Sequence, residues 1–270
     1  MTGIERIAAA FEAARSEERA ALMPYLMGGF PNGAASSRVI EAYAEAGADL
    51  IELGVPFSDP LADGPVIHDA ATKALAAGAT FDSVLDVGET VARSAPVIPM
   101  VYANMVLARG AKRFASQLAD AGMAGTIVPD LPPEEANEVR AALSAEGLAL
   151  IPLVAPTTPA ARRTEICREA TGFIYVVSDT RTTGERDQMP AELGKLVRAV
   201  QADAPVPAAV GFGIGTPEQA AEVGAVADGV IVGSRLVREV AEAADEDAAI
   251  EAVGAFISAS REAMSRPAVG

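Results

Sequence analysis

Short apolar runs alternate along this chain with longer alanine-rich stretches of mixed polarity. Each apolar run contains aliphatic or β-branched residues and ends near a turn residue such as Gly, Pro or Asp. That pattern is typical of a buried strand followed by a helix. Eight runs predict strands, at Leu22–Met27, Leu50–Val55, Val97–Ala103, Gly125–Val128, Leu148–Val154, Gly172–Val177, Val206–Gly211 and Gly229–Val232.

The stretches between these runs predict helices. Two of them open with residues that favour a helix start, Pro133 before two glutamates and Thr216 before Pro217. Residues 1–18 predict a leading amphipathic helix, and residues 241–270 a C-terminal helical region. The other predicted helices are Ser36–Ala46, Ile67–Ala76, Phe81–Arg93, Ala111–Ala121, Pro133–Ala145, Ala160–Glu169, Ala191–Ala202, Pro217–Val223 and a last region from Arg235 to Met264.

The alternation itself predicts the fold class. Strands that are apolar throughout and alternate with helices belong to parallel sheets covered on both faces. Eight such units in 270 residues fit a closed barrel, which typically needs roughly 250 residues. We therefore expect an α/β protein, a single (β/α)8 TIM barrel with an extra N-terminal helix, in which residues 1–270 form one domain.

In such a barrel the functional residues lie on the loops that follow the strands. Two of these loops are long. PFSDPLADGP follows the second strand and SDTRTTGERDQMP the sixth, whereas βα loops usually have about two to six residues. Long ordered loops usually line or cover a site, so we expect the site at these two loops.

Charge and composition narrow the classes of ligand and partner. The chain has 37 acidic and 21 basic side chains and a formal charge of −16. The electric field of this negative charge repels nucleic acids and anionic membranes, so neither is an expected partner. For the same reason, any phosphate site must be built from backbone amides. One cysteine, Cys167, excludes an intrachain disulfide and indicates a reducing cytoplasm, and the N-terminal stretch does not read as a signal peptide. One histidine excludes a histidine-rich metal centre, and no metal is expected.

Glu52 is the strongest candidate for catalysis. It lies inside the apolar run LIELGV, where strand alternation places its carboxyl on the opposite face from its neighbours. A buried unpaired carboxyl has a raised pKa and can exchange a proton near neutral pH, which suits general acid and base catalysis. The alternative is that Glu52 faces a helix and pairs with a buried Lys or Arg.

Asp63, Asp59 and His68 are weaker candidates from their sequence context alone. Asp63 precedes a Gly-Pro turn, and Asp59 lies in a Ser-Asp-Pro turn, so both suit the role of turn residue or helix cap. His68 begins a helix of mixed polarity and is expected to be solvated.

Two glycine turns near the C-terminus predict a phosphate site. The seventh strand ends in GFGIGTPEQ and the eighth in VGSR, and each turn opens onto a helix. Barrels often bind phosphate at these two loops. The expected donors are Gly213, Gly233 and Ser234, with Gly184 from the sixth loop, and the alternative is that these are ordinary tight turns.

Several segments together resemble the tryptophan synthase α subunit family. The segment IELGVPFSDPLADGPVI is the most specific, and VPDLPPEEA, VAPTTP, TGFIYVVS, VGFGIGTPEQ and ADGVIVGS follow in the family's order, across about residues 20 to 240. The resemblance implies an indole-3-glycerol phosphate lyase that pairs with a β subunit in an α2β2 heterotetramer. The α chain is then expected to carry no cofactor, and the β partner to carry pyridoxal phosphate.

The resemblance also implies roles for individual residues. Glu52 becomes the general acid and base of a retro-aldol cleavage, and Asp63 holds the indole N–H, which reverses its interpretation as a turn residue. Substrate contacts are expected at Tyr25, Tyr102, Tyr175, Thr183 and Phe212, and contacts with the β subunit at Asp59, Asn104 and Asp130.

The sixth loop departs from the family. Where the family typically has Ser-Arg-x-Gly-Val-Thr-Gly, this chain has Ser-Asp-Thr-Arg-Thr-Thr-Gly over residues 178–184. Arg181 replaces a flexible glycine and Asp179 adds a negative charge, so we expect altered loop closure and altered signalling to a β subunit. Three functions follow in order: an α subunit in the heterotetramer, a stand-alone lyase that releases indole, and a weakly catalytic activating partner of the β subunit.

Overall fold

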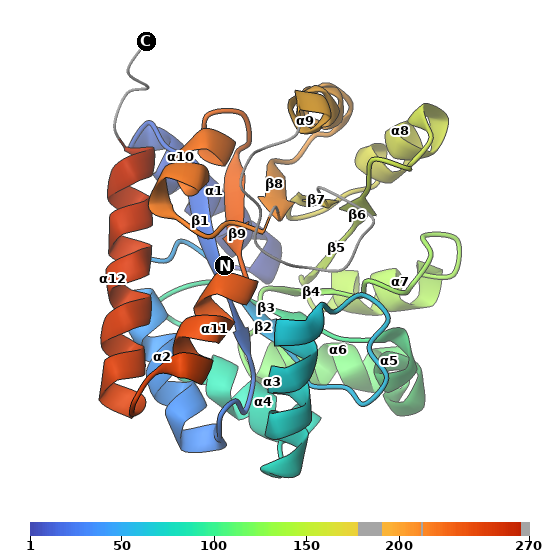
Figure 1. The fold of residues 1–270 in the computed structure, drawn as a ribbon. Coiled ribbons are helices and arrows are strands. Elements are labelled where there is room, and N and C mark those ends of the chain that lie inside the picture. The colour runs from blue at the N-terminus through green and yellow to red at the C-terminus, as the bar shows by residue number, and fades with distance from the viewer. Residues whose placement is uncertain (178–190, 212, 266–270) are drawn as a thin grey trace.

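Nine parallel strands form one sheet at the centre of the molecule, with helices around it (Figure 1). The computed structural model describes residues 1–177, 191–211 and 213–265. The sheet order is β5-β4-β3-β2-β1-β9-β8-β7-β6. The strands are β1 (Ala21–Met27), β2 (Ile51–Gly54), β3 (Val97–Met100), β4 (Gly125–Ile127), β5 (Ala149–Ile151), β6 (Leu153–Val154), β7 (Ile174–Val177), β8 (Ala208–Gly211) and β9 (Gly229–Val232).

The nine strands correspond to the eight predicted ones because the fifth is split at Pro152. β5 pairs with β4, and β6 pairs with β7. Pro152 has no N–H to donate to the ladder, but its carbonyl accepts a 2.9 Å hydrogen bond from the N–H of Tyr175. The two edges of the sheet are therefore one residue apart in the chain, and the barrel closes through this bent segment. The predicted (β/α)8 fold is confirmed.

The helices follow the predicted order, except that the predicted last region from Arg235 to Met264 is two helices, a further helix follows β3, and one helix begins later than predicted. They are α1 (Gly3–Ser16), α2 (Gly33–Glu45), α3 (Pro65–Ala76), α4 (Phe81–Glu89), α5 (Ala103–Arg109), α6 (Ala111–Asp120), α7 (Asn137–Ala145), α8 (Ala160–Arg168), α9 (Ala191–Asp203), α10 (Pro217–Gly224), α11 (Ser234–Glu242) and α12 (Glu246–Met264). α5 was not predicted, and the strand prediction that ran to Ala103 was wrong beyond Met100. α7 begins at Asn137 and not at Pro133. The N–H groups of Glu135 and Ala136 donate hydrogen bonds to the carbonyls of Pro132 and Pro133, and these bonds form turns before the helix.

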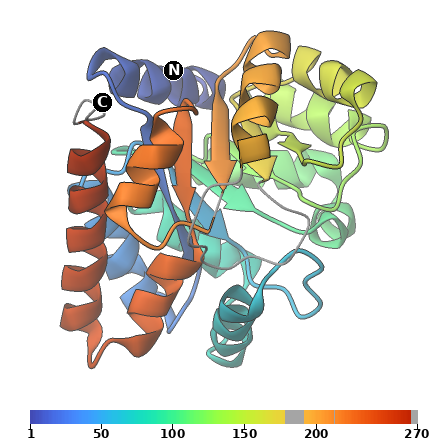
Figure 2. The same cartoon turned by 45° about the horizontal axis from the view of Figure 1, so that its top comes forward.

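The extra helix α1 closes the end of the barrel where the strands begin. In Figure 2 it lies across the end from which the arrows of β8 and β9 start. Its Ile7 and Phe11 are buried in the inner core with strand residues such as Met23 and Ile231. The guanidinium of Arg6 donates to the carbonyl of Gly122 at 2.8 Å, ahead of β4. With this mouth filled, the opposite end is the one available for a site.

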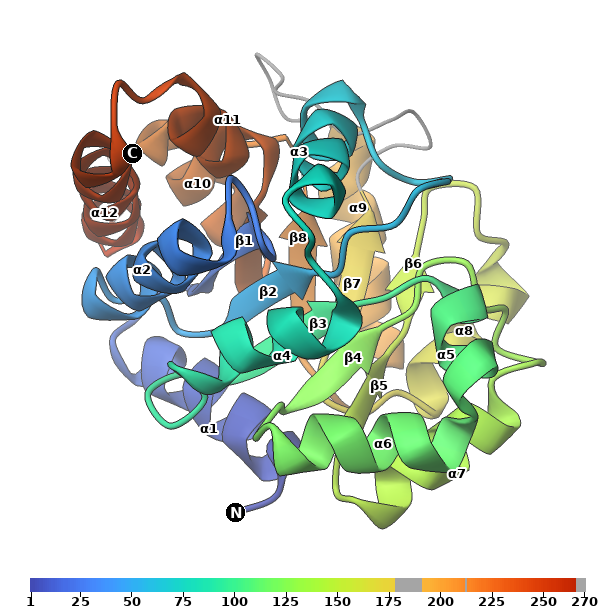
Figure 3. The same cartoon turned by 90° about the horizontal axis from the view of Figure 1, so that it is seen from below.

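The sheet register brings the strand ends together at that opposite end. Tyr25 pairs with Glu52 between β1 and β2, and Gly211 pairs with Ile231 between β8 and β9. Helices surround the strands in the view from below (Figure 3). No helix in the described ranges is both long enough and apolar enough to cross a membrane.

Candidate functional site

Glu52 points into the barrel and is buried. Its neighbours Ile51 and Leu53 belong to the outer core between sheet and helices, whereas Leu50 belongs to the inner core. Glu52 is 1% exposed, and among the described residues its Oε2 atom has no hydrogen-bond partner. Burial, and then the nearby charge of Asp63, raise the pKa of Glu52 to about 8.

This environment decides between the two interpretations of Glu52. The ion pairs of the described residues do not include Glu52, so the alternative of a buried Lys or Arg partner is wrong for this part of the chain. The carboxyl is instead held protonated near neutral pH, ready to give a proton and then to accept one.

Asp63 lies beside Glu52 on the loop between β2 and α3. Its Oδ1 atom accepts a 3.1 Å hydrogen bond from the hydroxyl of Tyr102, which itself accepts one from the N–H of Ala62 at 3.1 Å. Burial raises the pKa of Asp63, while the Tyr102 hydrogen bond and the charge of His68 oppose the rise. Gly64 is the residue that caps α3, so the helix-cap interpretation of Asp63 is not supported.

Two tyrosines approach the same space because two glycines leave room for them. A Cβ atom on Gly54 would lie 2.0 Å from the hydroxyl of Tyr25, and one on Gly211 would lie 2.7 Å from the hydroxyl of Tyr175. Burial, with the charges of Asp63 and Glu52, raises the pKa of Tyr25, and burial with the charge of Glu52 raises that of Tyr175. Both phenols therefore keep their protons, and the structure brings these tyrosines together with Glu52.

The glycine turns after β8 and β9 lie at the same end of the barrel. Gly213 has φ +63°, a conformation that glycine adopts without strain. Gly233 is the N-cap of α11, and Ser234, 6% exposed, is its first residue. The first N–H groups of a helix have no partner within the helix and attract anions. Three predicted site residues, Thr183, Gly184 and Phe212, lie outside the described residues, as does the altered loop of residues 178–184.

The three residues predicted to contact a partner lie on this same end but differ in exposure. Asp59 and Asn104 are exposed. Asp130 is half-buried, and its Oδ1 atom accepts a 2.8 Å hydrogen bond from the N–H of Ala103.

Sequence reasoning missed an apolar part of this surface. Leu61 is 81% exposed and Leu107 is 67% exposed. The signal for Leu61 was present in the PLAD segment of the second loop, while Leu107 lies on α5, the helix that was not predicted. Both are exposed aliphatic side chains on segments that follow β2 and β3, at the end of the barrel that carries the site.

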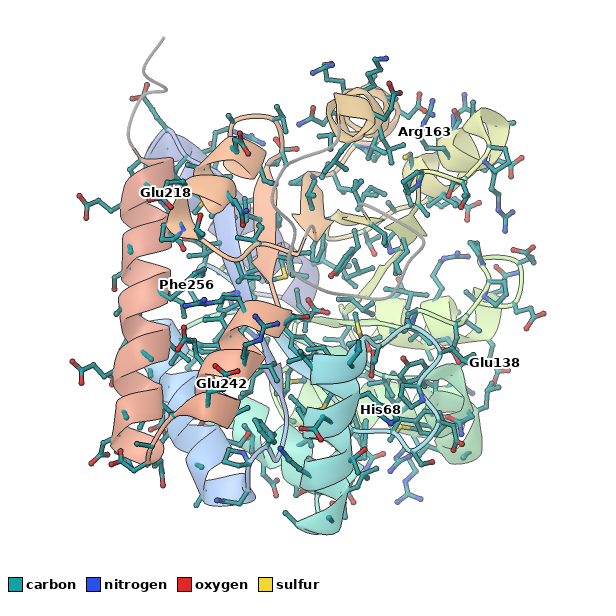
Figure 4. The ribbon with its side chains drawn as sticks, viewed as in Figure 1. His68, Glu138, Arg163, Glu218, Glu242 and Phe256 are labelled. Atoms are coloured by element: carbon teal, nitrogen blue, oxygen red, sulfur yellow. The ribbon has the colours of Figure 1, made fainter. Side chains whose placement is uncertain are left out.

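Metal chemistry is not supported by the geometry of the described residues. Across residues 1–177, 191–211 and 213–265 no group of three or more His, Cys, Asp or Glu is arranged to hold a metal ion. His68 is exposed on α3, where Figure 4 labels it, as the sequence predicted.

Fold and site together define a class. A closed parallel barrel that holds a buried carboxyl of raised pKa, with glycine turns after its last two strands, is a (β/α)8 protein whose site can exchange a proton near neutral pH.

Comparisons with known proteins place the chain more narrowly. The family model described as tryptophan synthase alpha chain matches residues 11–265. The tryptophan synthase alpha chain of Synechococcus sp. (strain CC9902) is 47% identical over 260 residues, covering 95% of this chain and 96% of that protein. The alpha chain of Geobacter sulfurreducens is 43% identical, covering 97% and 99%. The chain belongs to the tryptophan synthase α chain family.

Solved structures agree with this assignment. A structure of Mycobacterium tuberculosis tryptophan synthase is 36% identical with a TM-score of 0.90, covering 97% of this chain and 99% of that one. The alpha chain of Legionella pneumophila subsp. pneumophila is 37% identical with a TM-score of 0.88, covering 98% and 99%.

Proposed function

We propose that this chain, acting as a single domain, cleaves indole-3-glycerol phosphate to indole and glyceraldehyde 3-phosphate. The observation that carries the proposal is the buried carboxyl of Glu52 near Asp63. Its Oε2 atom has no hydrogen-bond partner among the described residues, and burial raises its pKa to about 8. A carbon–carbon cleavage of this kind needs one group that can both give and take a proton, and Glu52 is in the protonation state that starts the reaction.

The proposed reaction has two proton transfers. Glu52 first donates its proton to indole C3, which places positive charge on the ring nitrogen. The Asp63 carboxylate, fixed by Tyr102, accepts the hydrogen bond of the ring N–H and stabilises that charge. Glu52, now a carboxylate, then takes the proton of the side-chain hydroxyl next to C3. The bond between C3 and the carbon that bears this hydroxyl then breaks. Its electrons return to the indole ring, and the hydroxyl-bearing carbon becomes the aldehyde carbon of glyceraldehyde 3-phosphate.

The phosphate of the substrate binds, in this proposal, at the turns after β8 and β9. Gly213, Gly233 and Ser234 supply backbone donors, and Gly184 is expected to add another. The net charge of −16 makes a local site of amides necessary. Tyr25 and Tyr175 contact the substrate between the phosphate site and Glu52, together with Thr183 and Phe212.

A β subunit is the proposed partner, in an α2β2 assembly in the cytoplasm. Leu61 and Leu107 are exposed aliphatic side chains close in sequence to Asp59 and Asn104, and we expect them to supply apolar contacts among polar ones, as protein interfaces have. This chain uses no cofactor in the proposed reaction, and pyridoxal phosphate belongs to the partner.

One experiment tests the proposed function against its alternatives. The purified chain is incubated with indole-3-glycerol phosphate, with and without a β subunit, and indole and glyceraldehyde 3-phosphate are quantified. We expect equal amounts of the two products, formed faster with the β subunit. The same rate in both conditions would favour a stand-alone lyase. No cleavage in either condition would leave only the activating-partner function.

A further inference from the structure

The half-buried Asp130 lies on the turn after β4, but its side chain contacts another segment. A hydrogen bond from the N–H of Leu131 to the carbonyl of Val128 closes the turn. The Oδ1 atom of Asp130 accepts the 2.8 Å hydrogen bond from the N–H of Ala103, the first residue of α5. α5 has no capping side chain of its own, so Asp130 supplies the cap from 27 residues away.

Tyr102, directly before Ala103, is thereby held on both sides. The N–H of Val101 donates to the carbonyl of Ile127 at 2.9 Å, which fixes the residue before Tyr102 to β4. Asp130 fixes the residue after it to the turn that follows the same strand. Both anchors belong to one short segment, so movement of that segment moves the tyrosine backbone.

The Tyr102 side chain transmits this position to the loop between β2 and α3. It is 3% exposed, and its hydroxyl bonds at once to the carboxylate of Asp63 and to the N–H of Ala62. Its ring packs on Phe57 from the start of the same loop, with centroids 5.1 Å apart. Three contacts of one side chain therefore hold the loop that carries Asp63.

We infer that Asp130 is a positioning residue for Asp63, acting through the start of α5 and the hydroxyl of Tyr102. The catalytic consequence of this inference rests on the proposed function, in which Asp63 binds the ring N–H of the substrate. It gives Asp130 a role inside the chain besides the partner contact expected from its sequence. A partner that moved the turn after β4 would also move Asp63.

The first test measures the ionisation of Asp63 and needs no turnover. Among the described residues, the charged and titratable groups that interact with Asp63 include Tyr102, His68, Glu52 and Tyr25. Of these, the Tyr102 hydroxyl stabilises the carboxylate by a hydrogen bond, which lowers the pKa of Asp63. In carbon-13 NMR titrations of ¹³C-aspartate-labelled chain, Asp130→Ala and Tyr102→Phe should both raise the pKa of Asp63. The Asp63 signal is assigned by its absence in Asp63→Asn.

Matched variants distinguish the effect of losing the Asp130 hydrogen bond from the effects of losing its charge and of misfolding. Asp130→Asn keeps an oxygen acceptor for the N–H of Ala103 and should leave the Asp63 titration close to the parent. Glu135→Ala removes an exposed carboxylate from the same connection and should change nothing. Asp130→Ala together with Tyr102→Phe should raise the pKa of Asp63 no more than Tyr102→Phe does alone, because the effect passes through that hydroxyl.

Turnover gives the second readout. In the chain without partner, Asp130→Ala should lower kcat for indole-3-glycerol phosphate about tenfold, since small displacements of a positioning group cost up to about a hundredfold, while Asp130→Asn stays near the parent. An unchanged Asp63 titration in Asp130→Ala, additive effects in the double variant, or equal losses in the alanine and asparagine variants would each overturn the inference. If the parent itself formed no indole, the proposed function would fail, and the titration would still decide the role of Asp130.

Discussion

At the scale of single residues, the proposed reaction depends on the protonation state of Glu52. Burial and Asp63 raise its pKa to about 8 from an ordinary value of 4.5, so the folded chain holds this proton between about pH 4.5 and 8 and loses it above. Between these values the native state binds more protons than the unfolded state, and the contribution of Glu52 to stability falls as the pH rises.

The same pKa predicts the pH dependence of catalysis. The first step needs protonated Glu52, so kcat/KM should fall about tenfold per pH unit above pH 8. Tyr25 and Tyr175 keep their protons in this range, since their pKa values are raised, and a phosphate group titrates lower, at about pH 6. A steady-state pH profile measures this. A profile that stays flat or rises beyond pH 9 would contradict the role of Glu52 as the initial acid.

Asp63→Asn tests the second carboxyl. The amide keeps an oxygen that can accept the hydrogen bond of Tyr102, so the chain should fold as before, but it lacks the charge that stabilises the positive ring. We expect kcat to fall at least about a hundredfold, the size typical of losing one preorganised electrostatic group. Asp69→Asn is the control, because Asp69 is exposed on α3 and pairs only with Lys73 among the ion pairs of the described residues. If kcat of Asp63→Asn stayed within a few-fold of the parent value, Asp63 would again be interpreted as a turn residue.

At the scale of elements, the turns after β8 and β9 are predicted to bind the phosphate. Gly213→Asp places a carboxylate at that turn, and like charges a few ångströms apart cost several kcal/mol at the effective dielectric of a protein surface. The Michaelis constant should rise at least about tenfold. Gly78→Asp is the matched control, because Gly78 also has a positive φ, +88°, and open space around it, away from the site. If Gly213→Asp and Gly78→Asp raised the Michaelis constant equally, the cause would be backbone strain and not the charge placed at the turn.

Elements also show where sequence reasoning succeeds and where it fails. The inward direction of Glu52 followed from strand alternation, and the start of α10 followed from Thr216, whose side chain caps that helix together with Gln219. Helix α5 was missed because its cap, Asp130, lies 27 residues away. The split of the fifth strand at Pro152 could have been expected, since a proline within a strand removes one ladder hydrogen bond.

At the scale of the whole molecule, the fold class was predictable because it depends on a repeated local pattern. The site depended on contacts that no local pattern contains. The hydrogen bond between Tyr102 and Asp63 joins residues 39 apart, which follow the neighbouring parallel strands β3 and β2. The residues around Asp63 therefore did not indicate this contact, and a substrate role for Asp63 was expected only from the family resemblance. The exposure of Leu61 and Leu107 likewise became visible only in three dimensions.

In the proposed reaction, a barrel closed at one end by α1 holds at its other end one carboxyl, that of Glu52, which performs both proton transfers. The most direct test is the rate of indole formation from indole-3-glycerol phosphate by Glu52→Gln, measured beside the parent. The amide preserves the shape and removes a group that is already neutral near pH 7, so thermal unfolding at that pH should match the parent. We expect Glu52→Gln to form indole at least about a hundredfold more slowly than the parent, a loss within the range typical of a general acid or base. A folded variant with near-normal turnover would contradict it.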